Sequence, residues 1–204
     1  MADHTRLAVE NTTLVLLAAG RSERFGDIGS KLDEPFLGRP LGLHVAVTLE
    51  GMAFRDRVAV VNRAGLDYEA HGFRLLRNED AGTGLASSVK LGVRCARERG
   101  AEAVLIALAD MPRVTGAHIL RLFDASTGPD TVVASSDGRD PRPPALFGAG
   151  RFDFLLALDG DAGARDLVRA GRHVVTSPAE LLDVDTPEDL AHLRALVRPA
   201  ERMA

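Results

Sequence analysis

Residues 13–31 read T-L-V-L-L-A-A-G-R-S-E-R-F-G-D-I-G-S-K and hold the strongest structural signal in the chain. Residues 14–17 are apolar without alternation, which is typical of a strand covered on both faces in a parallel sheet. Ala18, Ala19 and Gly20 follow at once and have almost no side chain. Their backbone N–H groups can therefore approach a bulky anion closely. The stretch predicts an α/β fold with an anion-binding loop after its first strand.

The loop also carries a hydroxyl and several positive charges. They belong to Arg21, Ser22, Arg24 and Lys31. Between Arg21 and Arg39 four basic residues stand beside four acidic ones, so geometry rather than bulk charge must attract an anion. The loop has neither the G-x-G-x-x-G pattern of dinucleotide-binding folds nor the G-x-x-x-x-G-K-[ST] pattern of P-loops. It indicates another phosphate-handling fold, with an ordinary strand-to-helix connection as the alternative.

A-A-G-R-S-E-R-F-G at residues 18–26, followed by Lys31, resembles the signature loop of the molybdenum-cofactor nucleotidylyltransferases, a family of MobA-like NTP transferases. The A-A-G-x-S form is more similar to the cytidylyl branch of that family than to its guanylyl branch. The resemblance implies that the loop wraps a nucleotide triphosphate through Ala18, Ala19, Gly20, Arg21 and Ser22. It also implies catalytic roles for Arg24 and Lys31, which would neutralise the triphosphate.

Residues 102–108, a glutamate followed by the apolar run A-V-L-I-A-L, predict a strand that ends close to Asp110, within L-A-D-M-P. A carboxylate at the carboxyl end of a central strand in an open α/β sheet lies at the crevice where ligands bind. Mg²⁺ takes one or two carboxylates together with phosphate oxygens, so Asp110 suits a metal site; a turn-forming aspartate before proline is the alternative. L-x-D-M-P also resembles the metal-binding corner of the family, which implies that Asp110 is a catalytic metal ligand.

Residues 183–190, D-V-D-T-P-E-D-L, resemble the closing motif of the same family. That resemblance implies that Asp185 supplies a second carboxylate for the metal. Thr186 followed by Pro187 also predicts a helix N-cap with proline at the first helical position. This local role explains the sequence without any function, so both interpretations stand.

Residues 82–92, G-T-G-L-A-S-S-V-K-L-G, lead into a predicted helix. Simple N-capping by Thr83 or Ser87 would account for the hydroxyl groups. In the family that this stretch resembles, the corresponding pattern lines the nucleotide pocket with backbone and serine contacts. The resemblance therefore implies that Ser88 binds the nucleotide.

Two arginines are candidates for holding the phosphate of an acceptor molecule. In relatives, residues near 137–147 read G-x-x-G-H-P-x-L-F, whereas this chain has Arg142-Pro143 in place of Gly-His. A fixed cation thus replaces a titratable imidazole, and we expect Arg142 to bind the acceptor. G-D-A-G-A-R at residues 160–165 resembles a family motif that assigns the acceptor phosphate to Arg165. An ion pair between Asp161 and Arg165 is the alternative.

Composition excludes several classes of protein. A formal net charge of −4 and the absence of any long apolar run argue against nucleic acid and membranes as partners, and residues 1–12 lack the apolar core of a secretory signal. We therefore expect a cytoplasmic protein with a polar N-terminal extension at 1–12 and an NTP-transferase domain at 13–198. The single cysteine and the scattered histidines predict neither a disulfide nor a zinc site.

The patterns along the chain predict a single three-layer α/β/α domain with a mostly parallel, Rossmann-like sheet, and the resemblance implies the nucleotide-diphospho-sugar transferase type. Strands are expected at 14–17, 57–61, 73–76, 102–108, 131–134 and 173–176, helices at 39–50, 85–98, 114–126, 152–158 and from 187 onward, and a loop at 137–144. The resemblance implies Mg²⁺-dependent transfer of a nucleoside monophosphate from CTP, or another NTP, to a phosphate-bearing acceptor, with molybdopterin as the leading acceptor. The alternatives are a sugar- or alcohol-phosphate acceptor, and a non-catalytic protein that delivers molybdenum cofactor to a molybdoenzyme.

Overall fold

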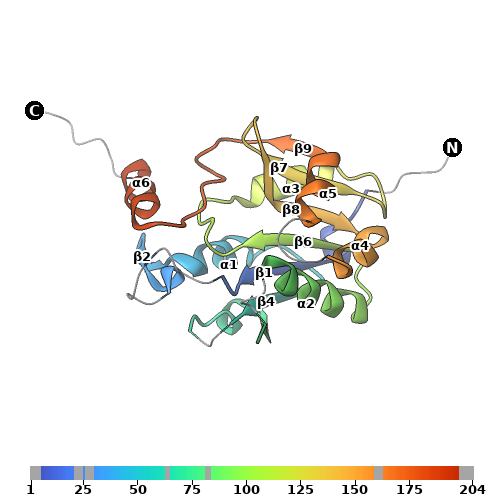
Figure 1. Ribbon diagram of the computed structural model, residues 1–204, viewed down its shortest axis with the longest axis horizontal. Helices are drawn as coiled ribbons and strands as arrows, with labels where there is room; N and C mark the ends of the chain where they lie inside the picture. The colour runs from blue at the N-terminus through green and yellow to red at the C-terminus, as the bar shows by residue number, and fades with distance from the viewer. Residues whose placement is uncertain are drawn as a thin grey trace, which may run out of the picture.

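The computed structural model describes residues 6–20, 25, 30–62, 65–80, 84–158 and 163–197. Its centre is a seven-stranded sheet of order β5-β4-β1-β6-β8-β7-β9 (Figure 1). The strands are β1 (Thr12–Ala18), β4 (Asp56–Val61), β5 (Arg74–Arg77), β6 (Ala103–Leu108), β7 (Val132–Ser136), β8 (Pro141–Gly148) and β9 (Arg172–Val175). Only β8 is antiparallel to its neighbours. The predicted mostly parallel α/β sheet is confirmed.

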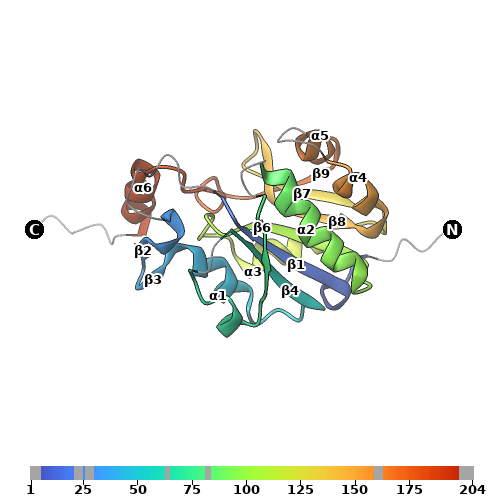
Figure 2. The same cartoon turned by 60° about the horizontal axis from the view of Figure 1, so that its bottom comes forward.

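Helices cover both faces of this sheet, and Figure 2 shows α2 lying across one of them. On that face are α2 (Leu85–Glu98), α4 (Phe152–Leu156) and α5 (Gly163–Ala170), whereas α1 (His44–Leu49) and α3 (Gly116–Asp124) lie on the other. In β1 the side chains of Leu14 and Leu16 join one core cluster, and those of Val15 and Leu17 join the other. This two-sided burial explains why the first strand is apolar without alternation.

A small third core brings together Phe25, Phe36, Leu41, Val184, Leu190 and Leu193, which lie far apart in the chain. The two-stranded sheet of β2 (Pro35–Phe36) and β3 (Arg39–Pro40) lies beside α6 (Pro187–Val197), away from the main sheet (Figure 1). Phe36 and Leu41 pack there against Leu190 and Leu193. The packing fixes the start of α6, and with it the segment that carries Asp185, close to Lys31.

The prediction of a helix from Arg39 to about residue 50 is wrong at its start. Arg39 and Pro40 are extended and pair with Phe36 and Pro35, and the backbone N–H of Leu41 donates to the Glu34 carbonyl at 2.8 Å. A 3₁₀ turn at Leu41–Leu43 then leads into α1. Proline suits an extended residue at a sheet edge as well as a helix start, so its presence could not decide between them.

The prediction of a loop at residues 137–144 is also wrong in part, because β8 begins at Pro141. Ser136 pairs with Pro141 and Ser135 with Arg142, and the register shifts between Ala134 and Ser135. β8 pairs with β6 only through its residues 145–148. The prolines of β8 therefore occupy the end of the strand that lacks a β6 neighbour, where a missing N–H removes the fewest ladder hydrogen bonds.

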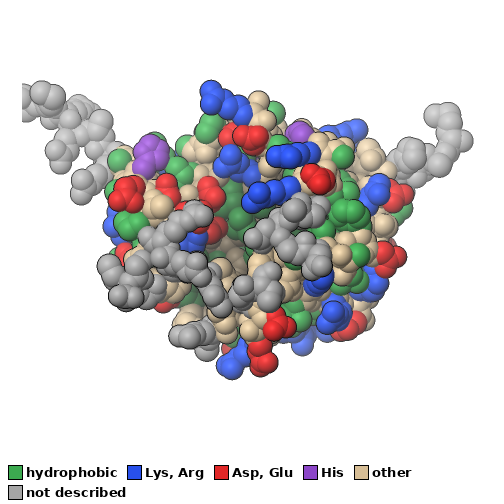
Figure 3. All heavy atoms as spheres, in the orientation of Figure 1, with side chains coloured by type: hydrophobic (Ala, Val, Ile, Leu, Met, Phe, Trp, Pro, Cys, Tyr) green, Lys and Arg blue, Asp and Glu red, His purple; other side chains and the backbone are tan. Residues whose placement is uncertain are grey.

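The surface carries charges of both signs. On the face shown in Figure 3, basic and acidic side chains are interspersed rather than gathered into one basic field, as the net charge of −4 leads one to expect. None of the helices in the described residues is both long enough and apolar enough to cross a membrane.

Candidate active site

The candidate site is a cavity of about 100 Å³ at the carboxyl ends of β1 and β6. These two strands pair in register up to Leu17 and Leu108, and the N–H of Ala109 donates to the Leu17 carbonyl at 3.0 Å. The residues that line the cavity are Leu17, Ala18, Ala19, Gly20, Lys31, Leu32, Leu85, Ser88, Leu108 and Asp110. Six of the predicted site residues are thus brought together, from four separate parts of the chain.

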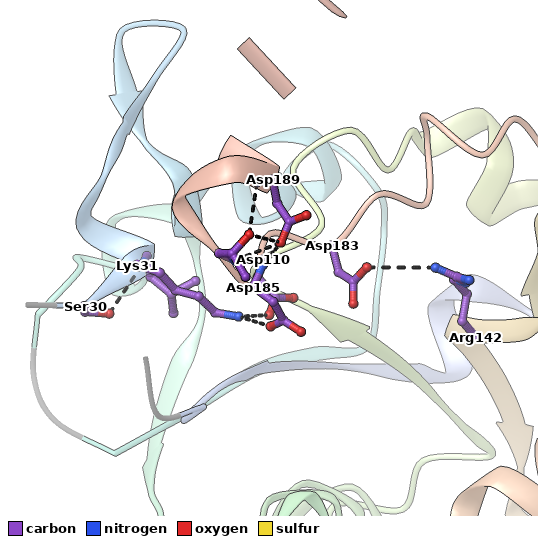
Figure 4. A network of polar contacts seen from close by, with 9 residues as sticks. Ser30, Lys31, Asp110, Arg142, Asp183, Asp185 and Asp189 are labelled. Carbon is purple, nitrogen blue, oxygen red and sulfur yellow. Dashed lines mark hydrogen bonds and ion pairs between the residues drawn. The ribbon is translucent and has the colours of Figure 1, made fainter. Parts of the chain in front are cut away.

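The Lys31 ammonium joins the two carboxylates that the sequence proposes as metal ligands (Figure 4). Its Nζ donates to Asp110 Oδ2 at 2.7 Å and to Asp185 Oδ1 at 2.8 Å. Lys31 begins a short 3₁₀ turn, Lys31–Asp33, and the Ser30 hydroxyl caps this turn by accepting from the Leu32 N–H at 3.3 Å. The Lys31 side chain is only 8% exposed, so the turn and its cap hold a buried positive charge at the wall of the cavity.

The pKa values of Lys31 and Asp110 are shifted by burial and by the neighbouring charges. Burial alone would lower the pKa of Lys31, but the charges and hydrogen bonds of Asp110 and Asp185 outweigh it and raise that pKa. For Asp110, burial raises the pKa of the carboxyl group, and the negative charges of Asp183 and Asp185 add to the effect, whereas the Lys31 ammonium opposes it. Lys31 therefore stays protonated. Every nearby positive charge stabilises the ionised form of the Asp110 carboxylate.

The start of α6 positions Asp185. The Val184 N–H donates to the Asp110 carbonyl at 3.0 Å, which ties the two carboxylate-bearing segments together. Thr186 Oγ1 accepts from the Asp189 N–H at 3.1 Å, while Asp189 Oδ2 accepts from the Thr186 N–H at 2.8 Å. The predicted N-cap at Thr186, with Pro187 as the first helical residue, is confirmed. Because the cap orients this turn, its local role and a role for Asp185 in the site are compatible.

A hard divalent cation fits the donor set at this place. Asp110 Oδ1 is buried and accepts no hydrogen bond within the described ranges, and a buried carboxylate oxygen without a donor is well suited to a metal ion. The described residues contain no cluster of three or more His, Cys, Asp or Glu side chains that could hold a metal. Mg²⁺ commonly relies on one or two carboxylates plus substrate phosphates, so Asp110 and Asp185 meet that requirement.

The two arginines proposed for the acceptor do not line the cavity. Arg142 donates to Asp137 Oδ2 at 3.1 Å, and its Nη1 lies 3.8 Å from Asp183 Oδ1, two residues before Asp185 (Figure 4). Its side chain is about one third exposed, so it forms part of the rim next to the carboxylates. Arg165 is exposed on α5. Asp161, its proposed ion-pair partner, lies outside the described residues, as do Arg21, Ser22 and Arg24.

The sequence patterns did not indicate Asn78, which hydrogen-bonds to the cavity residue Ser88 but does not itself line the cavity. Asn78 Nδ2 donates to Ser88 Oγ at 2.8 Å and to Ser87 Oγ at 2.9 Å. The helix N-cap is Gly84, which has positive φ and caps without a side chain, so the alternative of N-capping by Ser87 is not realised. Thr83, the other proposed cap, lies outside the described residues. A lone asparagine after a predicted strand gives no periodic signal, and only its place at a strand end could have indicated a role.

The chain is similar to several known proteins. Residues 14–175 match the model of the MobA-like NTP transferase domain. Purine catabolism protein PucB of Bacillus subtilis is 33% identical (88% of this chain, 94% of that protein), and phosphoenolpyruvate guanylyltransferase of Rubrobacter xylanophilus is 32% identical (86% and 88%). A molybdenum cofactor guanylyltransferase of Cereibacter sphaeroides is 31% identical (90% and 96%).

Solved structures show the same fold. A nucleotidyl transferase from Methanothermobacter thermautotroptrophicus superposes with a TM-score of 0.75 at 22% identity, covering 91% of this chain and 96% of that one. Rv0371c from Mycobacterium tuberculosis gives a TM-score of 0.72 at 26% identity, covering 92% and 100%. Rv0371c has also been solved as a complex with manganese.

Proposed function

The chain belongs to the family of MobA-like NTP transferases, and from this premise we propose that it transfers a nucleoside monophosphate from CTP to the phosphate group of molybdopterin, with release of pyrophosphate. That it is a nucleotidyltransferase follows from the family and the relatives. The observation that carries the proposal is the cavity that brings the Gly20 loop, Lys31 and Asp110 together. A triphosphate needs close backbone approach and positive charge, and this cavity offers both.

The reaction asks for little covalent chemistry from the protein. An oxygen of the acceptor phosphate attacks the α-phosphorus, the bond from that phosphorus to the β-phosphate oxygen breaks, and pyrophosphate leaves. The acceptor oxygen is already an anion, so no general base is required. Positioning and charge neutralisation therefore supply most of the rate, and Lys31 and Arg24 are proposed to neutralise the charge on the phosphates.

Mg²⁺ is proposed as the cofactor, held by Asp110 and Asp185. When bound, it offsets the negative charge that builds on the α- and β-phosphates during displacement. The buried Asp110 Oδ1, which lacks a hydrogen-bond donor among the described residues, supports this assignment. Rv0371c, solved with manganese, also supports a divalent cation at a site of this fold.

The base of the nucleotide is open to a direct test. The A-A-G-x-S form of the loop favours CTP, whereas two of the relatives are named guanylyltransferases. A screen of CTP, GTP, ATP and UTP, each paired with molybdopterin and with other phosphate-bearing acceptors, decides between them by following pyrophosphate release. Release of pyrophosphate with GTP alone would overturn the choice of CTP and leave the transferase proposal standing.

For the acceptor, Arg142 is proposed to bind the phosphate group, because it carries a fixed positive charge on the rim next to Asp183. Arg165 is proposed as a second contact. With the acceptor that the screen identifies, Arg142→Met should raise KM for that acceptor about tenfold and leave the affinity for NTP unchanged. A changed NTP affinity with an unchanged acceptor KM would contradict the assignment.

Two other functions remain as candidates. A different phosphate-bearing acceptor, such as an alcohol phosphate, is favoured by the relative that is named phosphoenolpyruvate guanylyltransferase, and the same screen includes it. A protein that only delivers molybdenum cofactor to a molybdoenzyme need not bind nucleotide. Calorimetry with CTP and Mg²⁺ separates this last possibility, because a complete absence of nucleotide binding would favour delivery over transfer.

A further inference from the structure

Asn78 is buried directly after β5, with only 5% of its surface exposed, and its backbone N–H and side-chain amide make hydrogen bonds within the described residues. Its Oδ1 accepts from the Asp80 N–H at 3.1 Å, and its own N–H donates to the Val61 carbonyl at 2.8 Å. A backbone N–H can only donate, so the atom that faces Asp80 must be the amide oxygen. The orientation of the Asn78 amide is therefore fixed, and its NH₂ group points to the two serines of α2.

This orientation assigns roles to the serine hydroxyls. Asn78 Nδ2 donates to Ser87 Oγ at 2.9 Å and to Ser88 Oγ at 2.8 Å. The Ser87 hydroxyl also lies 2.9 Å from the Gly84 carbonyl and donates to it. No residue in the described part of the chain accepts the hydroxyl hydrogen of Ser88. Ser88 is 4% exposed and lines the cavity, so this hydrogen is available to a ligand there.

The surroundings of Ser88 indicate which part of a ligand it meets. Leu17, Leu85 and Leu108 line the same cavity and offer apolar surface that suits the face of a nucleobase. The charged groups of the cavity, Lys31 and Asp110, suit phosphates and their metal instead. A few placed polar groups in a mostly apolar pocket fix the orientation of a ligand, and the Ser88 hydroxyl suits this role for a base.

We propose that Asn78 is a positioning residue for nucleoside recognition: its amide holds Ser88 Oγ as an acceptor, so that the Ser88 hydroxyl donates to an acceptor atom of the bound nucleoside. The inference rests on the proposed function, because it assumes a nucleoside triphosphate in this cavity. It adds a residue that no sequence motif assigned. It also specifies that the Ser88 hydroxyl acts as a hydrogen-bond donor, not an acceptor, toward the nucleoside.

The test reverses the direction of the hydrogen bond between residue 78 and Ser88 while keeping the shape of the side chain at residue 78. In Asn78→Asp, one carboxylate oxygen still accepts from Asp80, but the other can only accept from the serines. Ser88 would then donate to residue 78 and offer the nucleoside an acceptor instead of a donor. Calorimetry in Mg²⁺ should show Kd raised about tenfold for whichever of CTP and GTP the wild type binds more tightly, the size expected for one lost hydrogen bond.

Two further variants separate positioning from general support of the helix. Ser88→Ala should raise Kd by a similar factor, and the double variant Asn78→Asp with Ser88→Ala should lose no more than either one. Ser87→Ala is the matched control, because Ser87 accepts an equivalent Asn78 hydrogen bond but its hydroxyl hydrogen is taken up by Gly84. Its nucleotide Kd should stay within about twofold of the wild type, since no donor to the nucleoside is removed.

Pyrophosphate serves as the probe without a nucleoside, and its affinity should be unchanged in Asn78→Asp and in Ser88→Ala. Equal losses for pyrophosphate and nucleotide, or a loss in Ser87→Ala as large as in Ser88→Ala, would overturn the inference. The inference would also be overturned if Ser88→Ala had the same unfolding temperature as the wild type and bound nucleotide with unchanged affinity. If the wild type itself bound neither CTP nor GTP, the proposed function would fail rather than the role of Asn78 alone.

Discussion

Lys31 Nζ lies 2.7 Å from Asp110 Oδ2, although 79 residues separate the two in the chain. The same ammonium lies 2.8 Å from Asp185 Oδ1, 154 residues away. One positive charge thus holds together the 3₁₀ turn Lys31–Asp33, the end of β6 and the segment just before α6. A divalent cation held by these carboxylates would carry out the same neutralisation, so Lys31 and the cation compete for the same negative charge.

Replacing Lys31 with methionine keeps the aliphatic stem and removes the charge. We expect kcat of pyrophosphate release to fall about 100-fold or more, the usual loss when one charge-stabilising donor is removed, and Mn²⁺ to bind the nucleotide-free protein more tightly. Steady-state kinetics and calorimetry with Mn²⁺ measure the two effects. Lys90→Met is the control, since Lys90 is the only other lysine and does not line the cavity. A Lys31→Met protein with wild-type turnover would show that the ammonium has no part in the reaction.

Replacing Asp110 with asparagine removes the buried carboxylate without changing its size. Activity should fall more than 100-fold, and the Mg²⁺ concentration for half-maximal rate should rise, because the proposed ligand becomes a neutral amide. Titrations of rate against Mg²⁺ for Asp110→Asn and Asp185→Asn provide the comparison. The Asp110 effect should be the larger, since its side chain is 20% exposed and that of Asp185 is 44% exposed. The reverse order would place the main metal contact at Asp185.

The sequence predicted the features of the fold that follow from short stretches of the chain. The unbroken apolar runs of β1 and β6 indicated a parallel sheet because each strand is buried on both faces, and the aspartate after β6 therefore indicated the crevice. The β2–β3 pair could not be predicted, because Pro40 fits a helix start equally well. The contacts of Lys31 and Asn78 could not be predicted from the sequence either. Each depends on which strand ends and loops the fold brings side by side, and spacing in the sequence does not encode that.

Stability should depend on pH through His118, which is fully buried on α3. Its Nε2 lies 2.7 Å from Ser135 Oγ, and the Ser135 hydroxyl donates to the Pro144 carbonyl at 2.7 Å. Nδ1 accepts from the Arg121 guanidinium at 3.0 Å. The neutral tautomer with hydrogen on Nε2 satisfies every contact. Burial lowers the pKa of His118, and Arg121 acts in the same direction, whereas the Glu180 carboxylate opposes it.

Because the folded pKa of His118 is depressed, the unfolded chain binds a proton more readily. The contribution of neutral His118 to stability is therefore complete above roughly pH 6.5, the ordinary histidine value, and is lost as the pH falls below it. Urea unfolding should show a slope of up to about 1.4 kcal/mol per pH unit from this one group. His118→Gln should flatten the slope below pH 6.5. His44, whose pKa burial also lowers, adds to the wild-type slope in the same direction, so equal slopes in wild type and His118→Gln would refute the role of His118.

Gly92 marks the closest approach of α2 to the sheet. A Cβ at this position would lie 2.3 Å from Cγ1 of Val15, a fully buried residue of β1. Gly92→Ala should therefore cost about 1–3 kcal/mol of unfolding free energy through overpacking, despite the better helix propensity of alanine. Gly116→Ala is the matched control, since the nearest atom to its Cβ would be Met52 Sδ at 3.9 Å. It should be close to neutral in urea unfolding.

A second substitution, at Val15, tests whether overpacking causes the cost of Gly92→Ala. Val15→Ala removes the side-chain atoms that the new Cβ would meet, so it should relieve part of the cost of Gly92→Ala. Alone, Val15→Ala leaves a cavity and destabilises. In a double-mutant cycle the Val15→Ala and Gly92→Ala pair should therefore be more stable than the sum of the single effects, by about 1 kcal/mol. Strict additivity would mean that α2 shifts away from β1 to accept the alanine, and that the helix is less firmly packed on the strand that precedes the proposed nucleotide-binding loop.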